Sequence, residues 1–383
     1  MFNHKKLYSE GNSSIAPLEL KSCVLNETIL TNTFGGNGAI RITSSTLFYT
    51  TFQPKCNRDC IYINNCMLKH SIIEYNDGSE SNGFTLYNSN AFNTTVISFY
   101  FSNQHSVLLT IKKSIINDFK SLSISTYGIV RLSQSNITFE DSSIFNLTIG
   151  GSYSIYFQYA YYSLQSNFAI RRCNVTLGNI VVYDSSNRTQ ISVIDSILTK
   201  VSLRDLYPRD ILYTGNAILY MRNVSFLDAN ITSNLRTVDI AYSSMTLTTP
   251  FVAAEDSKIS CSSIGRSGLV KQASSVGIIA LSLTITNSTI KNFGTGIQAA
   301  AQGFNKITIT KNNFIGNSLY NVANKGAYDI NAAGNYWGTT GESVILNKIY
   351  DYLDDINYGD VLYKKYSTKA LSAEAGCPRY IKA

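Results

Sequence analysis

The sequence has few charged residues and few residues of the types on which most catalytic and metal sites depend. Charged residues make up 15% of the 383 positions, and the only histidines are His4, His70 and His105. Three scattered histidines provide no zinc or copper cluster. No Gly-x-Ser-x-Gly, P-loop, dinucleotide-binding or His-Glu-x-x-His pattern occurs either. These common hydrolase, nucleotide-binding and metalloprotease chemistries are therefore not indicated.

Long apolar segments and runs of basic residues are also missing. No apolar run approaches the roughly eighteen residues that would span a bilayer. The opening Met-Phe-Asn-His-Lys-Lys lacks the apolar core of a signal peptide. The net charge of +7 is modest, and no basic run marks a nucleic-acid surface. The sequence as written predicts no membrane span and no nucleic-acid partner. It fits either a non-secreted protein or a secreted one whose numbering starts after its signal.

What the sequence does have is an eight-residue pattern that recurs fourteen times: apolar, any, apolar, any, any, small, any, apolar. The second apolar residue is the reference position of each repeat. The reference positions are Leu20, Ile42, Ile63, Leu86, Ile111, Leu132, Ile170, Val193, Met221, Ile240, Ile259, Ile285, Ile309 and Ile330. The alternation predicts strands with one buried face. The recurring period of about twenty-two residues predicts one solenoid turn per repeat.

The repeat therefore predicts an all-β parallel β-helix of about fourteen turns over residues 18–338. Leucine-rich repeats have a similar length but require a Leu and Asn signature that is missing here. With strands stacked about 4.8 Å apart, the turns would form a rod on the order of 65 Å long. Residues 1–17 are either an N-terminal cover or a disordered lead, and residues 339–383 are a capping helix and a tail.

The expected end cap follows the last repeat. Thr339 and Glu342 have the spacing of a helix capping box. Trp337, the only tryptophan, is placed to plug the open end. Apolar residues follow at helical spacing, and they are Ile345, Ile349, Tyr352, Leu353 and Ile356.

The segments Gly334-Asn-Tyr-Trp-Gly338 and Tyr358-Gly-Asp-Val-Leu-Tyr363 resemble the ending of many right-handed parallel β-helix repeat proteins, the broad pectin-lyase-like group. With a repeat region of about 320 residues, the resemblance implies a right-handed β-helix. It says little about function, because this fold is used by lyases, hydrolases, tailspikes, adhesins and inert spacers. Family members often have a proline after the last aromatic residue, and Lys364-Lys-Tyr stands there instead.

The resemblance also implies an alternative function, that of a polysaccharide lyase or hydrolase. Pectate-lyase-type sites use aspartates to bind calcium and an Arg or Lys as base. Arg172 and Asp195 occupy the same position of consecutive predicted repeats and are the best candidate catalytic pair. The other interpretation of this pair is an exposed cross-strand ion pair. Calcium would be a cofactor only under the lyase alternative, and no other metal or cofactor is predicted.

The longest interruption of the repeat is rich in aromatic residues. They either stack on sugar rings or anchor a protein partner, or they form an extra strand layer on the rod. These residues are Tyr153, Tyr156, Phe157, Tyr159, Tyr161 and Tyr162.

The seven cysteines divide into three groups. Cys23, Cys66 and Cys173 lie in the small inward position of the repeat and are expected to be buried and unpaired. Cys23 and Cys66 are two turns apart, which is too far for a disulfide. Cys56 and Cys60 either close on each other in an oxidising compartment or are two free loop thiols. Cys261 and Cys377 have no evident partner.

Ten Asn-x-Ser/Thr sequons are candidate glycosylation sites, against about eight expected by chance in so Asn- and Ser-rich a chain. They are Asn12, Asn26, Asn93, Asn136, Asn146, Asn174, Asn187, Asn223, Asn230 and Asn287. The sequence thus favours a non-catalytic extracellular or cell-surface β-helix glycoprotein. We expect it to act as a rigid structural or adhesive rod that contacts glycans, other proteins or further copies of itself, with assembly into fibres as an extension.

Overall fold

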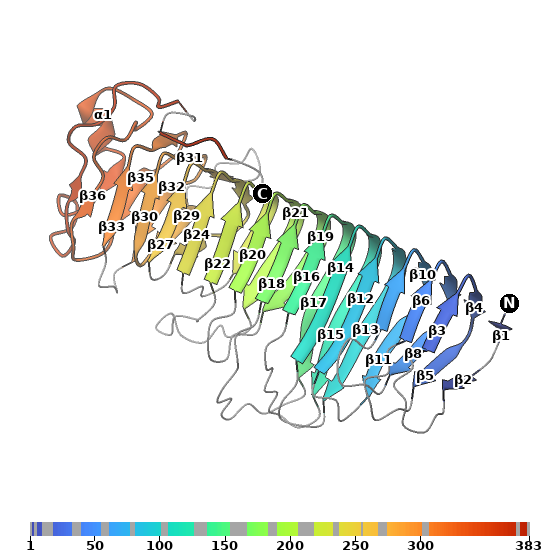
Figure 1. Cartoon of the computed structure of the whole chain (residues 1–383). Coiled ribbons are helices and arrows are strands. Elements are labelled where there is room, and N and C mark those ends of the chain that lie inside the picture. Colours follow the sequence, from blue (N-terminus) through green and yellow to red (C-terminus); the bar gives the residue numbers. More distant parts are fainter. Residues whose placement is uncertain are drawn as a thin grey trace. The chain divides into compact units, whose positions relative to one another are not determined.

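The structure is a computed structural model of the chain, shown in Figure 1. It describes residues 2–3, 6–9, 18–32, 40–54, 61–76, 81–100, 106–125, 136–153, 167–182, 190–205, 218–232, 237–253, 256–266, 274–300, 306–372 and 376–380. The chain forms two compact units, Met1–Ser192 and Val193–Ala383, which are called unit 1 and unit 2. Both units are built from parallel strands that wind in successive turns, so the predicted parallel β-helix is confirmed.

In unit 1 each turn passes from a strand of sheet B to one or two strands of sheet A. The strands of sheet B are β3 (Leu18–Lys21), β6 (Ile40–Thr43), β9 (Ile61–Asn64), β12 (Ser81–Tyr87), β14 (Ser106–Lys112), β16 (Asn136–Glu140) and β18 (Asn167–Arg171). Those of sheet A are β1 (Phe2–Asn3), β2 (Lys6–Ser9), β4 (Val24–Asn26), β5 (Ile29–Asn32), β7 (Thr46–Phe48), β8 (Thr51–Pro54), β10 (Met67–Lys69), β11 (Ile72–Asn76), β13 (Asn90–Tyr100), β15 (Ile115–Ser125), β17 (Ser143–Tyr153) and β19 (Asn174–Val182).

Unit 2 has the same two kinds of strand and a third sheet. Its sheet B strands are β22 (Ile218–Arg222), β24 (Thr237–Ala241), β27 (Ser257–Ser260), β30 (Leu283–Thr286), β33 (Ile307–Thr310), β36 (Ile330–Asn331) and β38 (Val361–Leu362). Its sheet A strands are β21 (Ile197–Asp205), β23 (Ser225–Thr232), β25 (Ser244–Leu247), β28 (Ser263–Arg266), β31 (Thr289–Lys291) and β34 (Asn313–Ile315). The third sheet contains β26 (Phe251–Ala253), β29 (Val276–Ala280), β32 (Thr295–Ala299), β35 (Tyr320–Asn324) and β37 (Ile349–Tyr350), and β20 (Gln190–Ile194) contains the boundary between the units.

Strand pairing extends past both predicted boundaries of the repeat. Before Leu18, Phe2 pairs with Leu25 and Lys6 pairs with Ile29, so parts of residues 1–17 already belong to sheet A. After residue 338, Ile330 pairs with Val361 in sheet B. The winding therefore begins earlier and continues later than the eight-residue pattern indicates.

The register is confirmed for most repeats and corrected for two. Reference residues such as Ile42, Ile63 and Ile111 are fully buried, as the alternation predicts. However, Ile111 pairs with Phe139, so Phe139 and not Leu132 is the reference residue of that turn. Residues 130–135 lie outside the described part of the chain.

The register of the last predicted repeat is wrong by two residues. Thr308 pairs with Asn331, which places Ile330 in the first apolar position and Ala332 in the reference position. Tyr328, predicted to point inward, is 57% exposed. A shift of two keeps each side chain on the same face of a strand, which is why the alternation did not reveal the error.

Each turn leaves sheet B through a sharp corner whose residue has a left-handed backbone. In unit 1 these corner residues are Ser22, Ser44, Asn65, Asn88, Lys113, Asp141 and Arg172, with φ from 50° to 54° except 46° at Asn88 and 49° at Asp141. Such a conformation costs a non-glycine residue about 1–2 kcal/mol. From Ser22 to Asp141, each corner N–H offsets part of this cost by donating to a carbonyl of the next turn, as from Ser44 to Asn64 at 3.0 Å.

The small residue that follows each corner is a hydrogen-bonding residue, not merely a small one. The backbone N–H of Ser89 donates to Oγ of Ser114 at 3.2 Å, and Ser114 N–H donates to Oγ of Ser142 at 3.2 Å. Each of these hydroxyls donates in turn to the carbonyl two residues before it. In unit 2 the same column ends in two asparagines, Asn312 and Asn335, and a polar ladder runs to them from the N–H of Val224.

A short helix is present in the predicted end segment, but it is shorter than the apolar spacing indicated. The helix α1 (Glu342–Leu346) has only five residues, and its N-cap Gly341 makes no side-chain capping bond, so the predicted capping box does not form. Ile349 lies in strand β37, where it pairs with Val322 of β35. Leu353 is 76% exposed and is not part of any cap. Ile345 and Trp337 are buried, and the Trp337 ring stacks on Phe314 with centroids 5.2 Å apart.

The end of the chain runs back along the corners of unit 2. Asn313 exchanges two hydrogen bonds with the backbone of Leu371, and Asn287 donates to the carbonyl of Gly376. Cys261 and Cys377 form a disulfide, so the prediction that they have no partner is wrong. The segment 366–380 is called the C-terminal tail.

Candidate functional site

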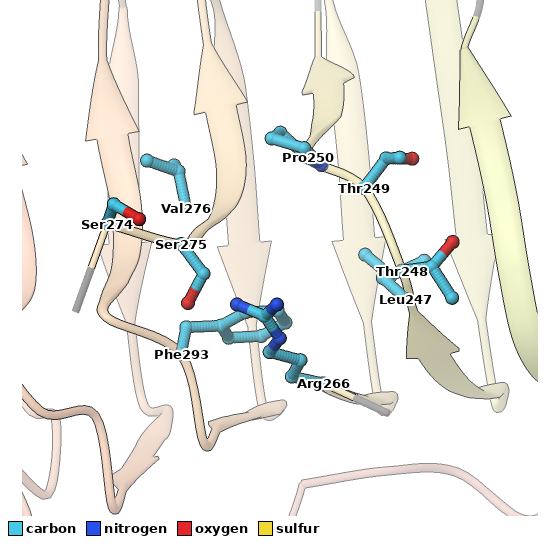
Figure 2. Close-up of a pocket in the computed structure, with 9 residues that line it drawn as sticks. All are labelled: Leu247, Thr248, Thr249, Pro250, Arg266, Ser274, Ser275, Val276 and Phe293. Carbon is cyan, nitrogen blue, oxygen red and sulfur yellow. The ribbon is translucent and has the colours of Figure 1, made fainter. Parts of the chain in front are cut away.

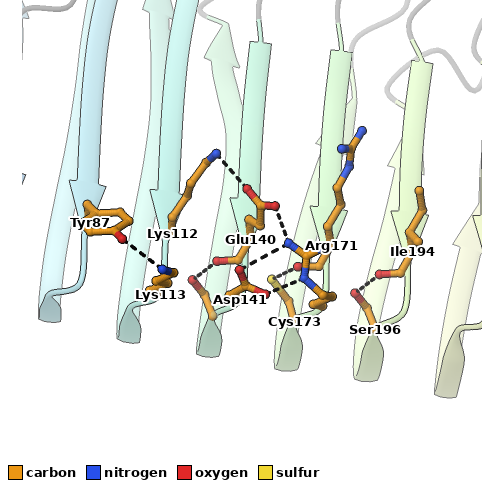
Figure 3. A network of polar contacts seen from close by, with 11 residues as sticks. Tyr87, Lys112, Lys113, Glu140, Asp141, Arg171, Cys173, Ile194 and Ser196 are labelled. Carbon is orange, nitrogen blue, oxygen red and sulfur yellow. Dashed lines mark hydrogen bonds and ion pairs between the residues drawn. The ribbon is translucent and has the colours of Figure 1, made fainter. Parts of the chain in front are cut away.

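The densest group of charged side chains in the described residues lies at the sheet B corner of unit 1 (Figure 3). Glu140 ends strand β16 and Asp141 is the corner residue after it, while Arg172 is the corner residue of the next turn. The Arg172 guanidinium pairs with Glu140, and its Nε lies 2.6 Å from Oδ1 of Asp141. Lys112, one turn before, places its Nζ 2.8 Å from Oε2 of Glu140. Lys113 donates to the Tyr87 hydroxyl at 3.1 Å.

The electrostatics of this cluster favour the charged forms of Glu140, Asp141 and Arg172. The hydrogen bond from Lys112, followed by that from Arg172, holds the pKa of Glu140 below its usual range. Arg172 likewise lowers the pKa of Asp141, and the two carboxylates raise the pKa of Arg172. A general acid or base needs a pKa near the working pH. These shifts move all three groups away from neutrality, so the arrangement is suited to holding two turns together rather than to proton transfer.

The cluster predicts a pH dependence of stability. Because the carboxyl pKa values are lowered in the folded state, their contribution is present above the ordinary values of 4.5 and 3.8 and is lost as the pH falls through the folded values. We expect the double variant Glu140→Gln, Asp141→Asn to have a slightly lower Tm than the wild type at pH 7, since the pairs are exposed to solvent. The difference should shrink as the pH falls through the lowered pKa values of the two carboxyls. Thermal unfolding over a series of pH values from neutral to strongly acidic measures it, and a difference that stays constant in acid would contradict this origin.

The predicted catalytic pair is divided between the two units. Arg172 belongs to unit 1 and is held by Glu140 and Asp141. Asp195 belongs to unit 2, where it accepts a hydrogen bond from Nδ2 of Asn223 at 2.7 Å and interacts with Tyr380 of the C-terminal tail. Both are corner residues, as their shared repeat position predicts. Each makes its polar contacts within its own unit.

The outward face of sheet A in unit 1 has a different character, and it is called the sheet A face. Two rows of side chains cross its strands. The first row is Val24, Thr46, Met67, Asn90, Ile115, Ser143 and Asn174, and the second row is Asn26, Phe48, Lys69, Phe92, Asn117, Phe145 and Thr176. Phe145 is 46% exposed and Ile115 is 55% exposed, while Phe48 and Phe92 are half-buried. At the next corner, Tyr49 stacks on His70 with ring centroids 4.9 Å apart.

A small pocket of about 160 Å³ lies in unit 2 (Figure 2). Its wall combines apolar side chains, including Pro250 and Phe293, with hydroxyl groups of Thr249 and Ser275 and with Arg266. Ser275 Oγ is already engaged by the N–H of Gly294 at 2.8 Å. No carboxylate lines the pocket, so it offers a small polar recess without an acid or base pair.

Several predicted sequons serve the corners of the turns. Asn93, Asn146, Asn223 and Asn287 all have left-handed backbones, and their Nδ2 atoms contact His70, Asp118, Asp195 and Gly376, respectively. Asn230 accepts a hydrogen bond from Thr249, Asn26 is half-buried, and Asn174 is exposed on strand β19. The structure does not describe Asn12, Asn187 or the Asn136 side chain.

Other predicted site residues fall outside the described part of the chain. The aromatic insertion is described only as far as the backbone of Tyr153, so Tyr156, Phe157, Tyr159, Tyr161 and Tyr162 are not placed. Cys56 and Cys60 are not placed either. The three inward cysteines form no disulfide, as predicted; Cys66 and Cys173 are buried, whereas Cys23 is only half-buried. Burial raises the pKa of the Cys173 thiol to about 11, so this thiol is unreactive at neutral pH.

Neither a metal cluster nor a membrane helix is present within the described ranges. No group of three or more His, Cys, Asp or Glu side chains there is arranged to hold a metal ion. None of the helical residues described forms a segment long and apolar enough to cross a bilayer. Comparisons with protein-family models, with curated proteins and with solved structures give no match for this chain. The strand pairing alone therefore defines its class, that of the parallel β-helix proteins.

Proposed function

We propose that this chain is a non-catalytic extracellular or cell-surface β-helix protein that acts as a structural and adhesive scaffold. The observation that carries the proposal is the contrast between the two outward faces of unit 1. Glu140, Asp141 and Arg172 neutralise one another on sheet B, and their pKa values are moved away from neutrality. The sheet A face instead presents exposed aromatic and apolar side chains, which bind partners without proton transfer.

The disulfide supports the extracellular part of the proposal. Disulfides persist in oxidising environments and are rare in the cytosol. The Cys261–Cys377 bond joins positions 116 residues apart and fastens the C-terminal tail to unit 2. The exposed sequon Asn174 is the described position best suited to carry a glycan, because no hydrogen bond or ion pair of its side chain occurs in the structure and it lies on the surface.

The lyase or hydrolase alternative requires a carboxylate or a basic group that is available to a substrate. Arg172 would have to leave two carboxylates before it could act as a base, and the raised pKa makes the loss of its proton still harder. The geometry therefore favours binding over cleavage.

Two measurements on the natively purified protein test the proposal. Intact mass before and after glycosidase treatment should show a loss of glycan mass, while imaging of the same sample shows the assembly state. Incubation with a panel of acidic and neutral polysaccharides, with and without calcium, should release no new chain ends. Chain ends that appear with the wild type and disappear with Arg172→Ala or Asp195→Ala would overturn the non-catalytic assignment. An unglycosylated protein with reduced cysteines would overturn the extracellular one.

A further inference from the structure

The three phenylalanines of the sheet A face recur at a fixed interval, with Phe145 exposed and Phe48 and Phe92 half-buried. Lys69 pairs with Phe48 on the strand before it and with Phe92 on the strand after it. Asn117 lies in the same way between Phe92 and Phe145. Each ring is therefore two strands away from the next ring. Neighbouring strands lie about 4.8 Å apart, so the rings follow one another at about 9.6 Å along a line across the strands.

This interval matches one ligand class. In an extended β-linked hexose polymer the sugar rings are flat, alternate in orientation and repeat every disaccharide, a length close to the two-strand step. Each Phe would then meet an equivalent sugar face. Aromatic rings bind the C–H faces of sugars through apolar and π contacts. A coiled α-linked polymer has no straight repeat of this length and could not touch all three rings.

The charge of the face supports a neutral ligand. Among the fourteen positions of the two rows, Lys69 is the only charged residue, and its Nζ lies 5.6 Å from the centre of the Phe48 ring. The outward side of sheet B in the same unit carries Glu19, Arg41, Glu140 and Arg171. A nucleic acid or an acidic polysaccharide would need a line of basic groups along the sheet A face. The face instead offers amides and hydroxyls such as Asn90, Asn117 and Ser143 beside the rings.

Asn117 has a side-chain amide that is not fully hydrogen-bonded. Its side-chain Oδ1 has no hydrogen-bond partner among the described atoms, although it is shielded from solvent. A buried acceptor without a partner costs about 1–3 kcal/mol. Asn117 lies between Phe92 and Phe145 in the row, so a polymer stacked on these rings would pass over it.

We propose that the sheet A face of unit 1 binds a neutral, extended β-linked polysaccharide that lies across the strands and stacks on Phe48, Phe92 and Phe145. This inference deepens the proposed adhesive function and rests on it. The face would hold the polymer along its length, one disaccharide for every two turns. Additional turns would lengthen the binding site without any new kind of contact.

The test uses the full-length chain and co-sedimentation with amorphous β-1,4-glucan, with α-linked starch as the control polymer. The wild type should bind the β-glucan and not the starch. Each ring is expected to contribute about fivefold, so the triple variant Phe48→Ala, Phe92→Ala, Phe145→Ala should bind about a hundredfold more weakly. Tyr328→Ala removes a ring that is 57% exposed in unit 2 and should bind as the wild type does.

A rearranged variant tests the spacing separately from the number of rings. Phe92→Asn combined with Asn117→Phe keeps three phenylalanines on the row but changes their steps to three strands and one strand. We expect it to bind about fivefold more weakly than the wild type, since only two rings can then meet equivalent sugar faces. Circular dichroism and thermal unfolding establish that both variants are folded.

The outcomes separate this inference from the proposed function. Unchanged β-glucan binding by the triple or the rearranged variant would overturn the proposed polysaccharide site on the sheet A face but not the scaffold function. Failure of the wild type to bind β-glucan would also overturn the polysaccharide site. So would a triple variant that loses only self-association in analytical ultracentrifugation. Release of sugar from the bound polymer would overturn the non-catalytic function but not the polysaccharide site on the sheet A face.

Discussion

Replacing Asn335 by Ala is expected to lower the free energy of unfolding of unit 2 by about 3 kcal/mol or more. Asn335 is fully buried at the end of the polar ladder. Its Oδ1 accepts the N–H of Asn312 at 2.8 Å, and its Nδ2 donates to the carbonyls of Ile309 and Ala332 at 2.6 and 2.7 Å. The substitution leaves these three buried backbone groups without partners, each at a cost of about 1–3 kcal/mol.

Urea unfolding followed by tryptophan fluorescence measures this effect locally. Trp337 is the only tryptophan and is buried two residues from Asn335, so its emission reports on this end of unit 2. Ser243→Cys is the matched control, because Cys occupies the same ladder position at Cys66 and Cys173. It should cost less than about 1 kcal/mol. Equal losses for the two variants would mean that the ladder bonds do not determine stability.

Replacing Cys377 by Ser is expected to destabilise unit 2 by about 5 kcal/mol in the loop-entropy model, because the bond closes a loop of more than a hundred residues. The sequence separation of Cys261 and Cys377 is 116. Without the bond, the C-terminal tail is held by weaker contacts such as those of Asn287 and Asn313 and by the tilted ring contact between Tyr242 and Tyr380.

Unfolding of the wild type with and without reductant should reproduce the difference between the wild type and Cys377→Ser. Cys23→Ser serves as the control, since Cys23 is unpaired and Ser is common in its column. Limited proteolysis should cut the tail of the Cys377→Ser variant before the rest of unit 2. A reduced wild type as stable as the oxidised one would show that the bond contributes nothing beyond the tail contacts.

The class of fold could be predicted because each turn buries the same columns. Aliphatic residues at alternate positions fix which face of a strand is buried. They do not fix which repeat pairs with which. The segment from Val130 to Ile137 fits the same pattern as the segment from Ile137 to Ile144, and only the pairing of Phe139 with Ile111 and Ile170 shows which one forms the turn.

That register error also hid the partners of Arg172. With Leu132 as the reference residue, the corner position of the preceding turn falls on Gln134, an uncharged residue. With Phe139 as the reference, it falls on Asp141, and Glu140 precedes it. The ion pairs of Arg172 were therefore within reach of the sequence, but only in the correct register.

The composition of the column of small residues that follow the corners indicated hydrogen bonding. If a tight bend alone decided the residue, Ala and Gly would be common there. In the corrected register the column from Ser45 to Asn335 contains neither, and Val224 is its only residue without a polar side-chain atom. The tail disulfide left a weaker sign. Cys261 occupies an outward corner, unlike the three inward cysteines, but nothing in the sequence pointed to Cys377 as its partner.

The C-terminal tail also sets an order of events during folding. Cys377 follows Cys261 by 116 residues, so the bond cannot close until the intervening turns are synthesised and the tail has returned along their corners. Closure is therefore a late step, and it reports that the turns between the two cysteines have stacked correctly. A copy that is cut short or wound out of register retains a thiolate-forming group at Cys261. Thiol–disulfide exchange can capture such a copy, which gives an oxidising compartment a chemical means of distinguishing finished molecules from unfinished ones.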